Sequence, residues 1–162
     1  MLKPYEKILC PIDFEPNSAM ALKRAAMMVQ RHGGTLTVAH IISNPLSEIY
    51  RERILEAWGT QEDIERACME KPFSGFSTVV LDVAKVMIKA FVREHIGDIS
   101  YEMFIALDEH TYRAINDYAE EKGIDLIVMA THGRTGPKRL YFGSVAENIV
   151  RRSPCSVLIV RS

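Results

Sequence analysis

The sequence predicts an α/β fold in which a doubly wound, five-stranded parallel sheet carries helices on both faces. Short apolar or β-branched runs alternate with helical segments along the 162 residues. The run at 126–129 is apolar at successive positions, as expected of a strand that is covered on both faces. With 48% hydrophobic residues the chain can bury one core, so we expect a single domain over residues 1–162.

The amino-terminal part of the chain predicts a strand, a helix and a second strand. The strand at 7–14 carries a carboxylate, Asp13, near its end. Helix-start chemistry follows at 16–18, and Gly33-Gly34 ends the helix. The β-branched run at 35–42 is the second strand, which a crossover helix makes parallel to the first. The apolar stripe of the helix consists of Leu22, Ala25, Ala26 and Val29.

Residues 43–77 are interpreted as a variable insertion. They are charged and partly helical between 48 and 69, and we expect a break at 72–75. A regular amphipathic helix follows at 78–94, and Gly97 ends it.

The carboxyl-terminal part repeats the alternation. We expect a third strand at 100–107, then a helix that Asp108 can cap and Gly123 ends. The inward-facing residues of that helix are Ile115, Tyr118 and Ala119. The remaining elements are a strand at 126–129, a helix at 144–150 that ends near Ser153-Pro154, and a strand at 156–160.

Crossovers between parallel strands are right-handed, which gives a doubly wound sheet. If the chain winds outward from strand one in one direction for strands two and three, and returns for strands four and five, the strand order is 3-2-1-4-5. Strands one and four then flank the switch point, where sheets of this kind bind ligands at the carboxyl ends of their strands. Asp13 should therefore face residues 130–136. The Gly-bearing loop after strand four leads into a helix start, and converging backbone N–H groups there suit an anion such as phosphate.

Charge and composition exclude several classes of protein. The formal net charge is −1, which gives no overall field for nucleic acid or an anionic membrane. No apolar run approaches the ~20 residues of a membrane span, and the amino terminus lacks a signal peptide, so we expect a cytoplasmic protein. The three cysteines are far apart and have no zinc spacing, which favours buried thiols. The cysteines are Cys10, Cys68 and Cys155.

Two motifs carry a family resemblance. Residues 130–136 read Ala-Thr-His-Gly-Arg-Thr-Gly, and residues 143–147 read Gly-Ser-Val-Ala-Glu. With the strands at 7–13, 125–129 and 154–160, they closely resemble the universal stress protein family in its nucleotide-binding branch, over nearly the whole chain. The family pattern is Gly-x2-Gly-x9-Gly-[Ser/Thr]. This chain satisfies it with Gly133, Gly143 and Ser144, whereas Ala130 replaces the first glycine.

The resemblance implies a Rossmann-like fold that binds ATP or another adenine nucleotide, with Mg or Mn possible on the phosphates near Asp13. It implies Asp13 near the ribose, with Pro11 and Ile41 bordering the adenine. Carboxylate oxygens can accept hydrogen bonds from ribose hydroxyls, and amides at a helix start can hold phosphates. The predicted nucleotide-binding residues are Pro11, Asp13, Ile41, Ala130, His132, Gly133, Arg134, Gly143, Ser144 and Val145.

Several of these residues have structural alternatives. Ser144 and Glu147 form a Ser-x-x-Glu capping box, which is compatible with an added phosphate contact. Asp13 could be a turn residue, and His132 a plain loop residue. If the backbone at Ala130 needs a positive φ or close phosphate approach, its methyl costs affinity; in ordinary strand conformation alanine is tolerated. Arg134, Lys138 and Arg139 are either solvated surface residues or local positive charge beside the anion site. Asp108, Glu109 and His110 are interpreted as helix-start residues, and His40 as a strand-end histidine whose hydrogen bonds are satisfied.

The sequence does not require catalysis. No base–nucleophile pair is evident, and the loop lacks the Lys of a Gly-x4-Gly-Lys-[Ser/Thr] motif, so at most slow ATP hydrolysis or self-phosphorylation is expected. The first hypothesis is a nucleotide-responsive stress-response module. Alternatives are a nucleotide-free dimeric interaction module and, with less support, an adenylate-forming enzyme, whose pyrophosphate loop after strand one is missing. A receiver domain is discounted, because this chain lacks the pair of acidic residues that such a domain uses to hold Mg²⁺.

The last strand suggests a homodimer. In the order 3-2-1-4-5 the strand at 156–160 lies at a sheet edge, and an apolar edge left unpaired is usually covered in native proteins. A two-fold dimer through Ser156 to Val160 is the simplest cover, and the family resemblance implies the same assembly.

Overall fold

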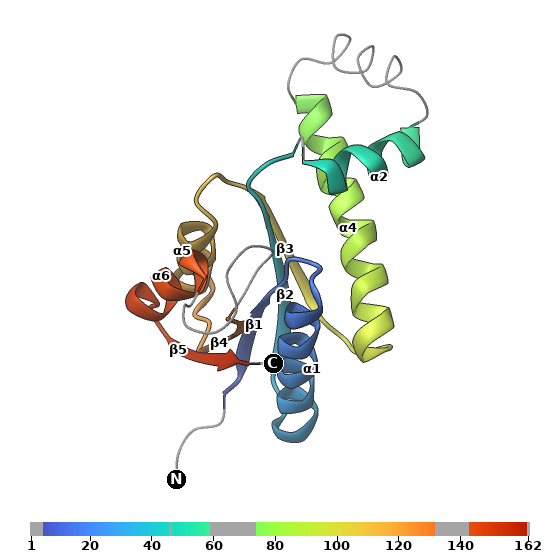
Figure 1. Ribbon diagram of the computed structural model, residues 1–162. Helices are drawn as coiled ribbons and strands as arrows, with labels where there is room; N and C mark the ends of the chain where they lie inside the picture. The colour runs from blue at the N-terminus through green and yellow to red at the C-terminus, as the bar shows by residue number, and fades with distance from the viewer. Residues whose placement is uncertain (1–4, 46, 59–73, 132–142, 162) are drawn as a thin grey trace.

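A five-stranded sheet forms the centre of the molecule (Figure 1). The computed structural model describes residues 5–45, 47–58, 74–131 and 143–161. Every pair of neighbouring strands is parallel, and their order is β3-β2-β1-β4-β5, which confirms the predicted topology. The strands are β1 (Lys7–Pro11), β2 (Thr35–Ile42), β3 (Glu102–Leu107), β4 (Leu126–Ala130) and β5 (Ser156–Val160), and the helices are α1 (Pro16–His32), α2 (Glu48–Trp58), α4 (Ser74–Ile96), α5 (Thr111–Lys122) and α6 (Ser144–Arg152).

Helices cover both faces of the sheet (Figure 1). The face under α1 and α4 buries Ile8 and Cys10 of β1, together with Ile12 just after the strand, and the face under α5 and α6 buries Leu9. Side chains of β1 thus alternate between two cores, as the two-residue period of a strand requires. The Cys10 thiol is fully buried, and the burial raises its pKa far above the ordinary value.

Three boundaries differ from the prediction. Strand β1 ends at Pro11 instead of continuing to residue 14, because the chain enters a turn at Asp13. Helix α4 begins at Ser74, inside the expected break, since packing of its first turns outweighs the low helix propensity of glycine and serine. Asp108 is not the cap of α5; its Oδ1 accepts the His110 N–H at 2.6 Å, and His110 is the N-cap.

A third, smaller core lies between α2 and the amino-terminal half of α4. Tyr50 and Ile54 of α2 pack there against Val79, Val80 and Val83. The same helix places Ile88 and Val92 in the main core further along. Helix α4 has 23 residues, yet none of the described helices combines the length and apolar character that crossing a bilayer requires.

The Asp125 carboxylate fixes the start of β1 against the start of β4. Its Oδ2 accepts the Glu6 N–H at 2.8 Å, and each of its oxygens accepts the Lys7 N–H at 3.2 Å. The Asp125 N–H in turn donates to the Lys7 carbonyl oxygen at 3.1 Å. These bonds precede the first paired residues, Ile8 with Leu126, so they set the register of the two central strands.

Gly34 lies against the backbone that leads into β1. Its φ is +103°, and a Cβ added there would be 2.6 Å from the carbonyl oxygen of Glu6. That oxygen also accepts the Thr35 N–H at 2.8 Å, so it cannot move away without breaking the β1–β2 connection. Glycine is therefore required at this position by both the backbone conformation and the close approach.

We expect Gly34→Ala to lower the free energy of unfolding by about 3 kcal/mol, because backbone strain and overpacking add. Gly33→Ala is the matched control. Its φ of +78° and ψ of −173° are also a conformation that essentially only glycine adopts, but nothing lies within 4 Å of the added Cβ, so only the conformational strain, about 2 kcal/mol, is expected. Urea denaturation of both variants measures the difference, and equal losses would contradict the close-approach explanation.

Candidate functional site

The carboxyl ends of β1 and β4 lie side by side at one edge of the sheet. Pro11 ends β1 and Ala130 ends β4, and the two strands are neighbours at the centre of the strand order. The chain leaves β1 toward α1, on one face, and leaves β4 toward α6, on the other (Figure 1). This is the switch point of the sheet, the position where folds of this class form ligand sites.

Asp13 forms a turn immediately after β1. Its Oδ1 accepts the Glu15 N–H at 3.1 Å, and its own N–H donates to Ser18 Oγ at 3.4 Å. Asp13 is therefore a turn residue, as the structural alternative proposed, and the turn uses one of its two carboxylate oxygens. The side chain is exposed, and within the described part of the chain its Oδ2 has no hydrogen bond. That oxygen remains able to accept from a ligand hydroxyl.

The residue after Asp13 is conformationally strained. Phe14 has φ of 65°, and it is the one described non-glycine residue with positive φ. Its ring lies 4.5 Å from the His40 ring and meets Phe91 edge-on at 5.6 Å. These aromatic contacts hold a conformation that is costly for a bulky residue. Sequence patterns gave no signal for this position, since its conformation depends on distant rings.

A hydrogen bond joins the end of β4 to the start of α6. The Gly143 N–H donates to the Thr131 carbonyl oxygen at 2.9 Å. A Cβ at residue 143 would be only 3.3 Å from that oxygen, so glycine allows the close approach. Helix α6 then begins at Ser144 with Gly143 as N-cap. The first amides of a helix have no intrahelical acceptor, which leaves donors at this edge.

The predicted capping box is wrong. Ser144 is the first helical residue instead of the cap, and the Glu147 N–H bonds to the Gly143 carbonyl oxygen at 3.0 Å. The side chain of Ser144 is exposed and makes no hydrogen bond within the described residues. Its hydroxyl is thus available for a ligand.

Ala130 adopts ordinary strand conformation. It is the last residue of β4, pairs with Val160 of β5, and does not have a positive φ. An alanine at this position therefore causes no backbone strain. Of the two effects that could make its methyl unfavourable, only close approach to a phosphate remains.

The remaining predicted residues are only partly described. Ile41 is 8% exposed and packs on the α5/α6 face together with Leu9 and Met129, whereas Pro11 is half-buried. Both are thus at the edge where β1 and β2 end. Val145 is half-buried in the first turn of α6. The predictions for His132, Gly133, Arg134, Lys138 and Arg139 fall outside the described residues.

A buried chain of hydrogen bonds connects the insertion to this edge. His40 Nδ1 lies 2.8 Å from the Ile12 carbonyl oxygen, and His40 Nε2 is hydrogen-bonded to the Tyr50 hydroxyl. Because a carbonyl only accepts, Nδ1 carries the proton and the neutral ring accepts from Tyr50 at Nε2. His40 is thus a satisfied histidine, as predicted, but the partner from α2 was not foreseen.

Burial lowers the pKa of His40, although the Ile12 carbonyl and the Asp13 carboxylate act in the opposite direction. The ring is therefore neutral at neutral pH, and the described hydrogen bonds match that state.

The fold and its site define a doubly wound α/β protein with a candidate ligand site at the switch point. The model of the universal stress protein family matches residues 4–161. This chain therefore belongs to the universal stress protein family.

Individual relatives agree with that assignment. Universal stress protein MJ0577 of Methanocaldococcus jannaschii is 26% identical over 162 residues, which cover 97% of this chain and 95% of the relative. A solved structure of MJ0577 superposes with a TM-score of 0.68 over 99% of this chain and 98% of that one, at 26% identity. A universal stress protein crystallised in complex with cAMP gives a TM-score of 0.59 at 22% identity, over 98% of both chains. The last likeness shows a shared fold.

We expect acid to destabilise the fold through His40. Above pH 6.5, the ordinary pKa of histidine, both folded and unfolded chains are neutral at this residue. As the pH falls below 6.5 the unfolded chain takes up the proton first, so the free energy of unfolding decreases. Urea denaturation between pH 7.5 and 5 measures the effect.

His40→Gln should reduce this pH dependence, whereas the control His32→Gln, at an exposed position on α1, should leave it unchanged. If the free energy of unfolding of the wild type and of His40→Gln depended on pH in the same way, His40 would not be the cause of the acid destabilisation.

Proposed function

We propose that this universal stress protein binds an adenine nucleotide, with ATP as the expected ligand, and acts as a nucleotide-responsive dimeric module in stress responses. It would do so as one domain, cytoplasmic, with residues 43–77 as an insertion. The observation that carries the proposal is the Thr131–Gly143 hydrogen bond, because it brings the start of α6 to the end of β4 at the switch point.

Each described residue would have a distinct role in the nucleotide site. The Oδ2 atom of Asp13 would accept a ribose hydroxyl, and Pro11 and Ile41 would border the adenine. The amides of Ser144 and Val145, with the Ser144 hydroxyl, would donate to phosphate oxygens. Mg or Mn would bind through those phosphates near Asp13. His132, Gly133 and Arg134 stay part of the proposed site on the basis of the sequence.

Two lines of reasoning support a nucleotide over an empty site. Ala130 replaces the first glycine of the family pattern, but it adds no backbone strain, so one objection to nucleotide binding is removed. A protein of the same fold and family has been crystallised with cAMP, an adenine nucleotide. The rival function is a nucleotide-free interaction module. It would be favoured if phosphates had to approach residue 130 closely, because the Ala130 methyl would then weaken nucleotide binding.

Adenine nucleotide should stabilise the protein against heat. At a free ATP concentration of 100 Kd, with Mg, binding adds about 2.7 kcal/mol, which corresponds to a rise in Tm of roughly 5–10 °C for a domain of this size. Asp13→Asn keeps the oxygen that accepts the Glu15 N–H but removes the charge, so we expect about tenfold weaker binding.

The matched control is Asp117→Asn, an exposed carboxylate on α5, which should bind as the wild type does. Calorimetric titration compares the three proteins. No thermal shift with ATP, ADP or cAMP would favour the nucleotide-free module instead.

The proposed dimer would form through β5. This strand ends the strand order and pairs with β4 alone in the described part of the chain. Its residues 157–160 are half-buried and apolar, so a second copy of the strand would pair the open backbone edge and cover these side chains.

We expect a solution mass of twice the 18.3 kDa chain at micromolar concentration. Val160→Lys, at the end of the edge strand, should shift the protein toward monomer because each copy would carry a charged ammonium group into the apolar surface that the partner strand would cover. Val150→Lys on α6 is the control, since Val150 is already 50% exposed and lies outside the strand. Sedimentation velocity gives the masses and circular dichroism verifies folding. A monomeric wild type would rule out this interface.

A further inference from the structure

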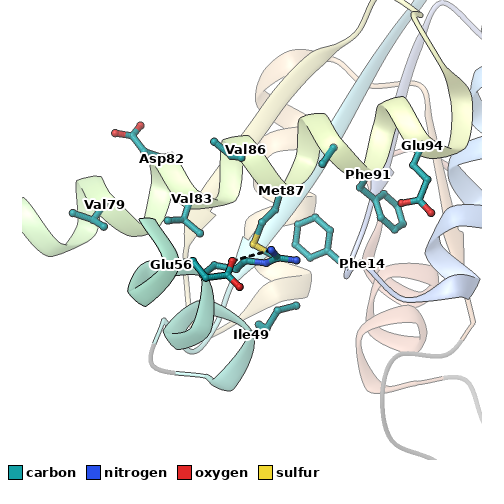
Figure 2. A pocket seen from close by; sticks show the side chains of 12 residues that line it. Phe14, Ile49, Glu56, Val79, Asp82, Val83, Val86, Met87, Phe91 and Glu94 are labelled. Carbon is teal, nitrogen blue, oxygen red and sulfur yellow. Dashed lines mark hydrogen bonds and ion pairs between the residues drawn. The ribbon is translucent and has the colours of Figure 1, made fainter. Parts of the chain in front are cut away.

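A pocket of about 640 Å³ lies between α2 and α4 (Figure 2). This volume is within the range of small-molecule sites in proteins. The pocket walls come from α2, α4 and Phe14, which follows Asp13 in the chain and packs in the core under α1 and α4. The pocket thus lies on the opposite face of the sheet from Ile41, which faces α5 and α6. Its apolar lining consists of Phe14, Ile49, Val79, Val83, Val86, Met87, Ala90 and Phe91.

The lining presents apolar surface that the described residues do not cover. Val86 is 68% exposed, and Met87 beside it is only half-buried. Helix α2 packs against Val79 and Val83 in the amino-terminal half of α4 and leaves the groove beyond them open. An apolar ligand body would remove this surface from water, which is favourable in proportion to the area buried.

Aromatic rings close the end of the pocket near the sheet. Phe14 and Phe91 meet edge to face at 5.6 Å with an interplanar angle of 84°, and both rings line the pocket. Figure 2 shows Glu94 beside Phe91 at this end, one helical turn further along α4. A carboxylate next to aromatic rings is an environment that stabilises an organic cation.

The other charged side chains of the pocket are already paired. Arg53 Nη1 lies 3.0 Å from Glu56 Oε2, and Asp82 Oδ1 lies 2.8 Å from Lys85 Nζ. Glu94 is the pocket residue whose charge has no ion-pair partner among the described residues. One guanidinium and three carboxylates line the pocket, so its charge complements a cationic ligand and disfavours an anionic one.

We propose that the pocket between α2 and α4 binds an organic cation that has an apolar hydrocarbon body. The hydrocarbon would lie along Val83, Met87 and Val86, and the ammonium group would lie at Glu94 beside Phe91. The apolar lining supplies affinity and the unpaired carboxylate sets the sign of the ligand charge. Arg53 forms an ion pair with Glu56, which reduces its attraction for an anion.

Binding can be measured with n-octylammonium as probe, at pH 7.5 and below its micelle concentration, by calorimetric titration of the full chain. The matched anion is octanoate. We expect octylammonium to bind at least tenfold more tightly than octanoate. Lengthening the alkyl chain should tighten binding by roughly fourfold per methylene until the pocket is full.

The charge assignment is tested with Glu94→Gln, which should weaken octylammonium binding about tenfold and remove most of the preference over octanoate. Glu109→Gln, an exposed carboxylate ahead of α5, is the control and should bind as the wild type does. Circular dichroism shows whether each variant is folded.

Three results would overturn the proposal: no octylammonium binding at millimolar concentration, tighter binding of octanoate, or an unchanged cation preference in Glu94→Gln. Tighter octanoate binding would assign the pocket to anionic amphiphiles through Arg53. The experiment involves no nucleotide, so its outcome is independent of the proposed nucleotide site.

Discussion

The pairing of β1 with β4 is the contact on which the rest of the structure depends. Asp125 holds it at one end, where its carboxylate accepts the N–H groups of Glu6 and Lys7. A buried parallel pair has no freedom to slip, because a one-residue shift would turn every side chain to the wrong core. With that register fixed, the carboxyl ends of the two strands meet at one edge and bring the Asp13 turn and the start of α6 to the switch point.

The parallel sheet was predictable from the sequence because its strands are apolar, short and separated by regular helices, and the assumed winding outward from strand one then gave the observed strand order. The boundaries at Gly33, Gly97 and Gly123 were predictable for a local reason: each glycine has a positive φ just after a helix. The start of α6 was not. Ser-x-x-Glu is a local signal for a cap at Ser144, but the close approach of Gly143 to the Thr131 oxygen moves the cap one residue back. That contact depends on β4, which the motif does not include.

The insertion was the least predictable region, and it provides the features that sequence patterns missed. Tyr50 lies in a charged stretch whose periodicity gives little indication of a buried face, yet it is 3% exposed and bonded to His40. Phe14 has no local signal either, since its conformation is held by rings from β2 and α4. Such contacts join residues far apart in the chain, and patterns within one segment carry no information about them.

The small core between α2 and α4 has a consequence for how the molecule opens. Among the described residues it is attached to the rest mainly through Ile42, Ile105 and the Tyr50–His40 hydrogen bond, whereas the second half of α4 belongs to the main core. A unit with few links of this kind can unfold on its own, at a lower free energy than the whole domain. The amides of α2 should therefore exchange with solvent as a separate cooperative unit. A ligand held between α2 and α4 would slow that exchange without altering the exchange of the central strands.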